Sequence, residues 1–350
     1  MGTLICLFSV LTVLYLGTIN NQRKTNSRLI QTLFCFSLLV MIQGLRHSTI
    51  GIDSCNIYRP YFESVSYGLT NIFDFGEVPY GFEKGFVLFT KLVKTLFNNT
   101  QFYIFLCSIV SIAPIAYLIY KYADNIPLAF IVFSTLIVYH FGFSGIRQAM
   151  AIGITCVAFE FLLKKKPLPF IIVTLIAFYF HTSALLFLIA YPLYHYLKLT
   201  PVRLLFLGIC FIIVLFFLQS FIVFLTDLIF GGEKYLDYIM KDTVPSYNLM
   251  ILFTAILLFT FMVKNERITR LRVILLMAVV FQSLGLLSSA ASRMAYYFIP
   301  YISLAIPITT NSTKLKIPLE LSIILLMILF YIYCNASGYL DVIPYKFYWE

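Results

Sequence analysis

The chain alternates long apolar runs with short polar breaks over almost its whole length. A membrane-spanning helix needs about 20 apolar residues, and runs of this kind, bounded by charges or by Pro, Gly and Asn, recur throughout. The pattern predicts twelve spans, at residues 2–20, 29–45, 101–120, 126–143, 146–163, 168–180, 182–197, 204–225, 248–263, 273–290, 294–310 and 317–334. We therefore expect an all-α polytopic membrane protein in which residues 1–350 form a single membrane domain.

The sixth and seventh predicted spans are short and share one apolar stretch, Pro167–Leu197, which lies between lysines. The polar sequence Phe180-His181-Thr182-Ser183 interrupts this stretch near its middle. Either two short helices meet at a polar apex, or one long helix is broken there. Two helices are favoured, because the loops along the chain then alternate consistently between the two sides of the membrane.

Composition excludes several classes of protein. The chain is 61% apolar and 11% charged, whereas soluble domains average about 45–50% apolar and 25% charged residues. A water-soluble enzyme, a disordered chain and a disulfide scaffold are excluded on these grounds. The seven cysteines are scattered without CxxC or His/Cys pairing, so the sequence predicts no metal site.

The distribution of charge predicts the topology. With the N-terminus outside, 15 of the 25 basic residues fall in six inner loops and 11 of the 15 acidic residues fall outside. The positive-inside rule therefore explains the net charge of +10, and no nucleic-acid partner is expected. Both termini are predicted outside. Glu160 and Glu320 each lie four residues from a lysine and are expected as solvated pairs near the inner face.

Two outer segments interrupt the spans. Residues 45–100 form the larger, and their stretch 83–97 alternates apolar residues with Lys84, Lys91 and Lys94. This pattern predicts an interfacial helix on the outer leaflet. Residues 226–248 form a second, acidic outer loop.

Two arginines open predicted spans at their outer ends. Arg147 and Gln148 begin the fifth span, where a helix N-terminus and a cation together favour an anion. Arg293 begins the eleventh, followed by Tyr296 and by Tyr297, which is expected on the same helical face. The two sites suit the two ends of a diphosphate. The alternatives are headgroup contacts for Arg147 and a tight turn with an interfacial aromatic belt for Arg293.

Other candidates lie near these arginines. His181 is a candidate general base or a donor to the leaving group, with a helix-capping histidine as the alternative. His140 is a candidate supporting residue. Asp53 and Glu83 are candidates to deprotonate or bind sugar hydroxyls, and Tyr58 offers an aromatic face to a sugar ring; ordinary acidic outer loops are the alternative.

Several short elements occur in a specific order. They are Gly51-x-Asp53 followed by Tyr58 or Tyr61, Glu83-x-Gly85-Phe86, Ile146-Arg147-Gln148-x-x-Ala151, the inner Lys164–Lys166, Ala177-x3-His181-x-Ser183-Ala184, Arg293 with Tyr296 and Tyr297, and Pro344-Tyr345. In this order the chain resembles, over nearly its whole length, the EpsG-like family of Wzy-type O-antigen and polysaccharide polymerases.

The resemblance implies a membrane glycosyltransferase of the GT-C type in a bacterial inner membrane. Such an enzyme transfers the growing glycan from polyprenyl diphosphate to a lipid-linked repeat unit at the outer face. The resemblance implies no cofactor and a metal-independent transfer, in agreement with the lack of a DxD-like motif near the outer arginines. The expected partners are the polyprenyl-diphosphate-linked oligosaccharide and membrane lipid, with a chain-length regulator and a flippase as candidate proteins.

Two other functions remain open from the residues. A flippase for lipid-linked oligosaccharides predicts charged groups within the spans, and no predicted span has one near its midpoint. An outer-face ligase, which moves finished glycan to another acceptor, differs little from a polymerase at this level.

Overall fold

The computed structural model describes residues 25–68, 72–75, 81–211, 247–286, 289–336 and 342–350, together with residues 213 and 217. The predicted span at 2–20 and all but the last two residues of the predicted loop 226–248 lie outside this part. The chain divides into two compact units. The first comprises residues 1–188 and 306–350, and the second residues 189–305.

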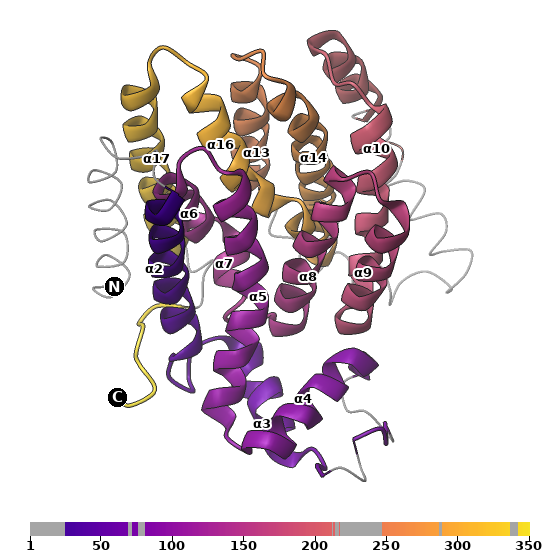
Figure 1. Ribbon diagram of the computed structural model, residues 1–350, viewed down its shortest axis with the longest axis vertical. Coiled ribbons are helices and arrows are strands. Elements are labelled where there is room, and N and C mark those ends of the chain that lie inside the picture. Colours follow the sequence, from indigo (N-terminus) through magenta and orange to yellow (C-terminus); the bar gives the residue numbers. More distant parts are fainter. Residues whose placement is uncertain are drawn as a thin grey trace. The chain divides into compact units, whose positions relative to one another are not determined.

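Four helices of the first unit form a row. These are α2 (Thr25–Gly44), α5 (Thr100–Tyr122), α8 (Ile146–Leu163) and α9 (Pro167–Phe180), each packed against the next (Figure 1). Another pair is formed by α6 (Ile126–Thr135) and α17 (Lys316–Ala336).

Apolar helices dominate the described residues. Four of them are long and apolar enough to cross a membrane, namely Ser27–Gly44, Thr100–Tyr122, Ile146–Leu163 and Lys316–Cys334. Shorter apolar helices include α6, α9, Pro201–Phe211 and α13 (Tyr247–Thr260). The predicted fold is thus confirmed at the level of an all-helical polytopic membrane protein.

A tight turn joins α8 to α9. The chain turns within Lys164–Lys166, where Lys165 adopts a left-handed conformation with φ of 54°, and Pro167 begins α9, a position that proline favours. The two helices pack closely as a hairpin. Because the connection is so short, the first residues of α8 and the last residues of α9 lie at one end, which we call the site end.

The chain reverses again at His181. The 3₁₀ helix η3 (Thr182–Ile189) follows α9, and its Phe187 lies 5.8 Å, between ring centroids, from Phe170 of α9. The prediction that the stretch Pro167–Leu197 forms two elements that meet at a polar apex is therefore confirmed. The second element continues as α10 (Ala190–Tyr196), a member of the second unit.

The prediction that residues 126–143 form a single helix is wrong. This stretch breaks between α6 and α7 (Ile137–Phe141) at Leu136, whose ψ of 150° is extended. The hydroxyls of Ser134 and Thr135 both donate to the carbonyl of Ile131, and such local bonds compete with helix continuation.

Two boundaries between residues 264 and 311 also differ from prediction. Helix α14 (Glu266–Ser283) begins inside the predicted loop 264–272, because the side chain of Asn265 caps it by accepting from the Arg267 N–H at 2.9 Å. The predicted span 294–310 instead consists of two 3₁₀ turns, η5 (Arg293–Tyr297) and η6 (Ile299–Tyr301), followed by α16 (Ile302–Asn311).

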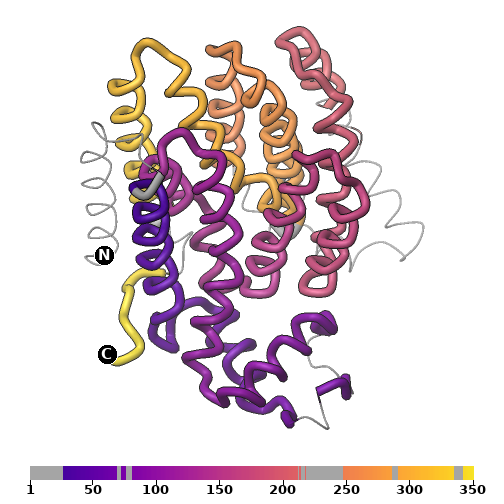
Figure 2. Tube along the Cα trace, in the orientation of Figure 1, coloured from indigo at the N-terminus to yellow at the C-terminus, as the bar shows by residue number. Residues whose placement is uncertain are grey.

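The segment after α2 folds into the π-helical turn η1 (Ser54–Tyr58), α3 (Arg59–Ser64) and α4 (Lys84–Phe97). Fully buried Arg46 fixes its start by donating to the Phe143 carbonyl at 2.9 Å and to Ser54 Oγ at 3.1 Å. The last residues of the chain lie beside the end of α2 (Figure 2): Phe347 pairs with Arg46 as an antiparallel bridge, and the Tyr345 hydroxyl donates to the Ile42 carbonyl at 2.7 Å.

The two helix-end glutamates are buried, so their prediction as solvated groups is wrong. At the end of the first unit opposite the site end, Glu160 bonds Lys121, Lys164 at 2.9 Å and the Tyr122 hydroxyl at 2.5 Å. Glu320 accepts from the Thr310 hydroxyl at 3.0 Å and from the Asn125 amide at 3.3 Å. Carboxylates packed between helices need such partners, because burial without them is costly.

Candidate functional site

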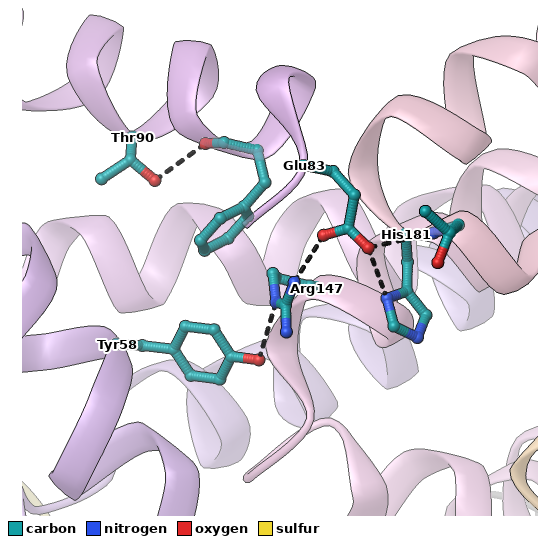
Figure 3. A network of polar contacts seen from close by, with 7 residues as sticks. Tyr58, Glu83, Thr90, Arg147 and His181 are labelled. Atoms are coloured by element: carbon teal, nitrogen blue, oxygen red, sulfur yellow. Dashed lines mark hydrogen bonds and ion pairs between the residues drawn. The ribbon is translucent and has the colours of Figure 1, made fainter. Parts of the chain in front are cut away.

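Four sequence-predicted residues meet at the site end of the first unit. The Glu83 carboxylate lies between Arg147 and His181 (Figure 3). One carboxylate oxygen accepts from Arg147 Nη1 at 2.5 Å, and the other from His181 Nδ1 and from the Thr182 backbone N–H, both at 3.0 Å. Tyr58 completes the cluster, since its hydroxyl accepts from Arg147 Nε at 3.3 Å. We call these four residues the Glu83 cluster.

The local fold explains this meeting. Arg147 lies in the first turn of α8 and His181 immediately follows α9, so the α8–α9 hairpin brings them to one end. Glu83 immediately precedes α4, and Gly85 lets α4 approach α9. A Cβ at Gly85 would lie 2.6 Å from the Tyr179 carbonyl oxygen, closer than such atoms approach. The Glu-x-Gly element is thus a steric requirement for placing Glu83 beside His181.

Arg147 keeps part of its binding capacity. Its guanidinium has five N–H groups, of which one on Nε and one on Nη1 are used. The others meet no acceptor in the described part of the chain. The Phe82 ring, 4.5 Å from Cζ, supports one face of the guanidinium. Arg147 is therefore held firmly and can still bind an anion through adjacent N–H groups.

Glu83 is held as an anion. Burial alone would raise the pKa of its carboxyl, but the hydrogen bonds from His181 and Thr182 and the charge of Arg147 outweigh burial and lower the pKa from 4.5 to about 2. A carboxylate this acidic is a poor base near neutral pH. Glu83 therefore serves to hold its neighbours.

The charge of Glu83 fixes the hydrogen bonding of His181. An ionised carboxylate only accepts hydrogen bonds, so His181 Nδ1 must be the donor. In the neutral ring, Nε2 is then the acceptor, and it has no partner among the described residues. The geometry thus provides an unoccupied ring nitrogen suited to accept a proton.

Asp53 lies beside the Glu83 cluster. Its backbone N–H donates to Ser144 Oγ at 3.0 Å, which ties the start of η1 to the residues before α8. Burial raises the pKa of Tyr58, Arg147 opposes that rise, and the nearby Asp53 carboxylate adds to it. Asp53 is half-buried, and no described residue bonds its carboxylate. The carboxylate is therefore available to a ligand.

Two predicted substrate-binding residues are buried. Gln148 is 5% exposed, on the packed side of α8. His140 is also buried, with Nε2 bonded to the Ser134 carbonyl at 2.8 Å and its ring 4.9 Å from that of Tyr331. None of the described contacts of His140 reaches the Glu83 cluster. The packing of His140 favours a role in holding the break between α6 and α7.

Arg293, Tyr296 and Tyr297 belong to the second unit. The prediction that Arg293 and Tyr297 share a helical face is wrong, because η5 is a 3₁₀ helix and residues four apart diverge at three residues per turn. Arg293 is exposed, whereas Tyr296 and Tyr297 are buried.

Sequence reasoning missed several supporting groups. Phe82, the Thr182 backbone N–H and Ser144 all contact site residues. Gly51 has a φ of 85° and abuts the Phe143 carbonyl, where a Cβ would clash. Only the glycines gave a signal, through the Gly-x-Asp and Glu-x-Gly elements.

Comparison with known protein families identifies the family of this chain. Residues 4–347 match the EpsG family. The chain belongs to the EpsG family. No curated protein and no solved structure gives a significant match. The resemblance seen in the sequence is thereby confirmed, and membership in the EpsG family indicates a membrane protein of polysaccharide synthesis.

Replacing Gly85 by alanine should separate α4 from α9. The added Cβ would lie 2.6 Å from the Tyr179 carbonyl oxygen and 2.8 Å from the Tyr179 Cβ, so Glu83 should move away from His181. We expect polysaccharide production in cells to fall by on the order of a hundredfold at unchanged protein level. Gly208→Ala is the matched control, because an added Cβ there would meet no described atom within 4 Å beyond its chain neighbours and its own helix backbone. Wild-type production by Gly85→Ala would refute this role.

Glu83→Gln should change the pH dependence of stability. The folded-state pKa lies below the ordinary value, so ionised Glu83 stabilises the fold above about pH 4.5, and this contribution is lost as the pH falls towards 2. The lowering corresponds to on the order of 3 kcal/mol. Unfolding of the detergent-solubilised protein should show a difference between wild type and variant at neutral pH that shrinks on acidification. A difference independent of pH would contradict the assignment.

Proposed function

We propose that the chain is a polysaccharide polymerase, a membrane glycosyltransferase of the GT-C type. It transfers a growing glycan from polyprenyl diphosphate to a lipid-linked repeat unit at the outer face of a bacterial inner membrane. One observation carries the proposal. A single carboxylate holds Arg147 beside His181, and among the described residues three N–H groups of Arg147 and Nε2 of His181 have no partner.

The reaction assigns a task to each group. An acceptor hydroxyl oxygen forms a bond to the anomeric carbon of the donor glycan, and the bond from that carbon to the diphosphate breaks. The hydroxyl proton passes to His181 Nε2. The bonding electrons leave with polyprenyl diphosphate, whose charge the free N–H groups of Arg147 stabilise. In this proposal Arg147 does what a metal ion does in other transferases.

The remaining residues position the substrates. Glu83 orients Arg147 and His181, and its low pKa argues against a role as the base. The Asp53 carboxylate, to which no described residue bonds, is suited to bind the acceptor sugar, and it is the alternative base. Tyr58 supports Arg147 and can donate its own hydroxyl hydrogen to a ligand. Arg293 is proposed as a second cation for the diphosphate on sequence grounds alone.

The membrane arrangement belongs to the same proposal. It has about twelve spans, with both termini and the segment 45–100 outside. Support comes from the first unit, where Arg147, His181 and the last residues of the chain lie away from the end that carries Lys121 and Lys164. A chain-length regulator and a flippase are the proposed protein partners.

Arg147→Ala should abolish polymer, because a single stabilising donor at a charge that develops in the transition state is worth about a hundredfold or more. In cells that carry the variant, single lipid-linked repeats should persist at the outer leaflet. Arg147→Lys should rescue poorly, since an ammonium cannot bind two oxygens in the forked geometry of a guanidinium. The measurement is polymer formation by purified protein in vesicles supplied with lipid-linked repeats alone.

The matched control is Arg270→Ala, because the Arg270 side chain is 42% exposed and its ion pair in the described part of the chain is with Glu266, one helical turn away. Its polymer yield should equal that of wild type. Full-length polymer from Arg147→Ala would refute the proposal. Repeats trapped at the inner leaflet of mutant cells would favour a flippase. Wild-type protein that fails to elongate repeats without another acceptor would favour a ligase.

A further inference from the structure

The outward face of α4 is apolar. Leu92, Leu96 and Phe97 are 41%, 70% and 53% exposed, and Leu88 is partly exposed. These side chains occupy a helix that also contains three lysines. A helix facing water on this side would turn its charges outward.

The lysines in the helix interior point into the protein instead. Lys91 and Lys94 are 4% and 5% exposed. Lys91 donates to the Asp74 carbonyl, and Lys94 donates to the carbonyls of Glu63 and Val65 at 2.7 and 3.0 Å. Both ammonium groups therefore fasten the preceding loop beneath α4. The face left outside carries no charge between Leu88 and Phe97.

The apolar face continues from the short apolar helix α9. Gly85, Leu88, Leu92 and Leu96 are spaced by three and four residues, so they share one face of α4. Gly85 abuts Tyr179, near the end of α9. Tyr179 is itself exposed and ends a stripe of exposed apolar side chains on α9, namely Leu168, Ile171, Ile172, Leu175 and Ile176. The stripe on α9 thus meets the stripe on α4 at the Gly85–Tyr179 contact.

The two ends of α4 fix its position relative to the ends of α9 and α5. Its first turn touches the end of α9, and its last residue, Phe97, lies three residues before α5 begins at Thr100. Helix α5 is long and apolar enough to cross a membrane, and α9 is a shorter apolar helix. Figure 1 shows α4 beyond the ends of α9 and α8, beside the start of α5. An apolar face that joins the ends of two such helices lies where the membrane meets water.

We propose that α4 is embedded in the surface of the membrane, with Leu88, Leu92, Leu96 and Phe97 among the acyl chains of the leaflet. The occupant of this face is bilayer lipid, because the face continues the exposed apolar surface of α9. Amphipathic helices bury such a face at the boundary between headgroups and acyl chains. Glu83 and His181, which flank α4 and α9, then lie at the level of the lipid headgroups.

A tryptophan reporter tests this placement. Trp349 is the single tryptophan of the chain, so a Trp349→Phe background accepts one new reporter at a time. Leu92→Trp reports on the apolar face, and Asn56→Trp, at an exposed polar position of η1, is the matched control. The full-length protein is reconstituted in phosphatidylcholine vesicles, with or without phospholipids brominated at shallow or deep positions along the acyl chain.

Tryptophan at position 92 should emit at shorter wavelength than the control, resist acrylamide, and be quenched most by shallow bromines. Equal acrylamide quenching at positions 92 and 56 would overturn the proposal. So would short-wavelength emission that brominated lipids leave unchanged, which would indicate cover by protein. Leu96→Trp is a second reporter if the first variant folds poorly. These readouts do not require glycan transfer, so their failure is distinct from failure of the proposed polymerase activity.

Discussion

The carboxylate of Glu83 is the group on which the site depends. It binds the first turn of α8 through Arg147 and the chain after α9 through His181 and the Thr182 N–H. These elements lie at one end only because the α8–α9 hairpin closes within three residues, and Glu83 reaches them only because Gly85 admits α4 to α9. Without this carboxylate, Arg147 would lose its counter-ion and His181 the group that sets which nitrogen accepts a proton.

The first unit uses its cations in two ways. Arg46 and Lys94 donate to backbone carbonyls, so their charges fasten loops to the helices. Arg147 instead faces a carboxylate, and some of its N–H groups meet no acceptor among the described residues. This difference separates an arginine that serves the fold from one suited to a ligand. The inward lysines of α4 have a further effect. Because they point inward to fasten the loop, the outward face of α4 is uncharged and suited to lipid.

The lengths of the apolar runs and the polar breaks between them predicted much of the fold. The bounds of α8 match the prediction, and the polar apex at His181 is where the chain turns. The break at Leu136 escaped prediction, because hydroxyl bonds within a uniformly apolar run leave hydropathy unchanged. Single candidate residues were recognisable by type and place. That these residues meet in the fold could not be predicted from the sequence. Glu83 lies 64 residues from Arg147 and 98 from His181, and tertiary packing alone brings them together.

The most direct test of the account is to locate the bound lipid diphosphate. A polyprenyl diphosphate with a photoreactive group next to the diphosphate would be crosslinked to the full-length protein in vesicles, and the labelled peptides identified by mass spectrometry. The account predicts label on the peptides that contain Glu83, Arg147 and His181, with loss of label when unmodified polyprenyl diphosphate competes. Competed label confined to the opposite end, around Lys121 and Lys164, would contradict it.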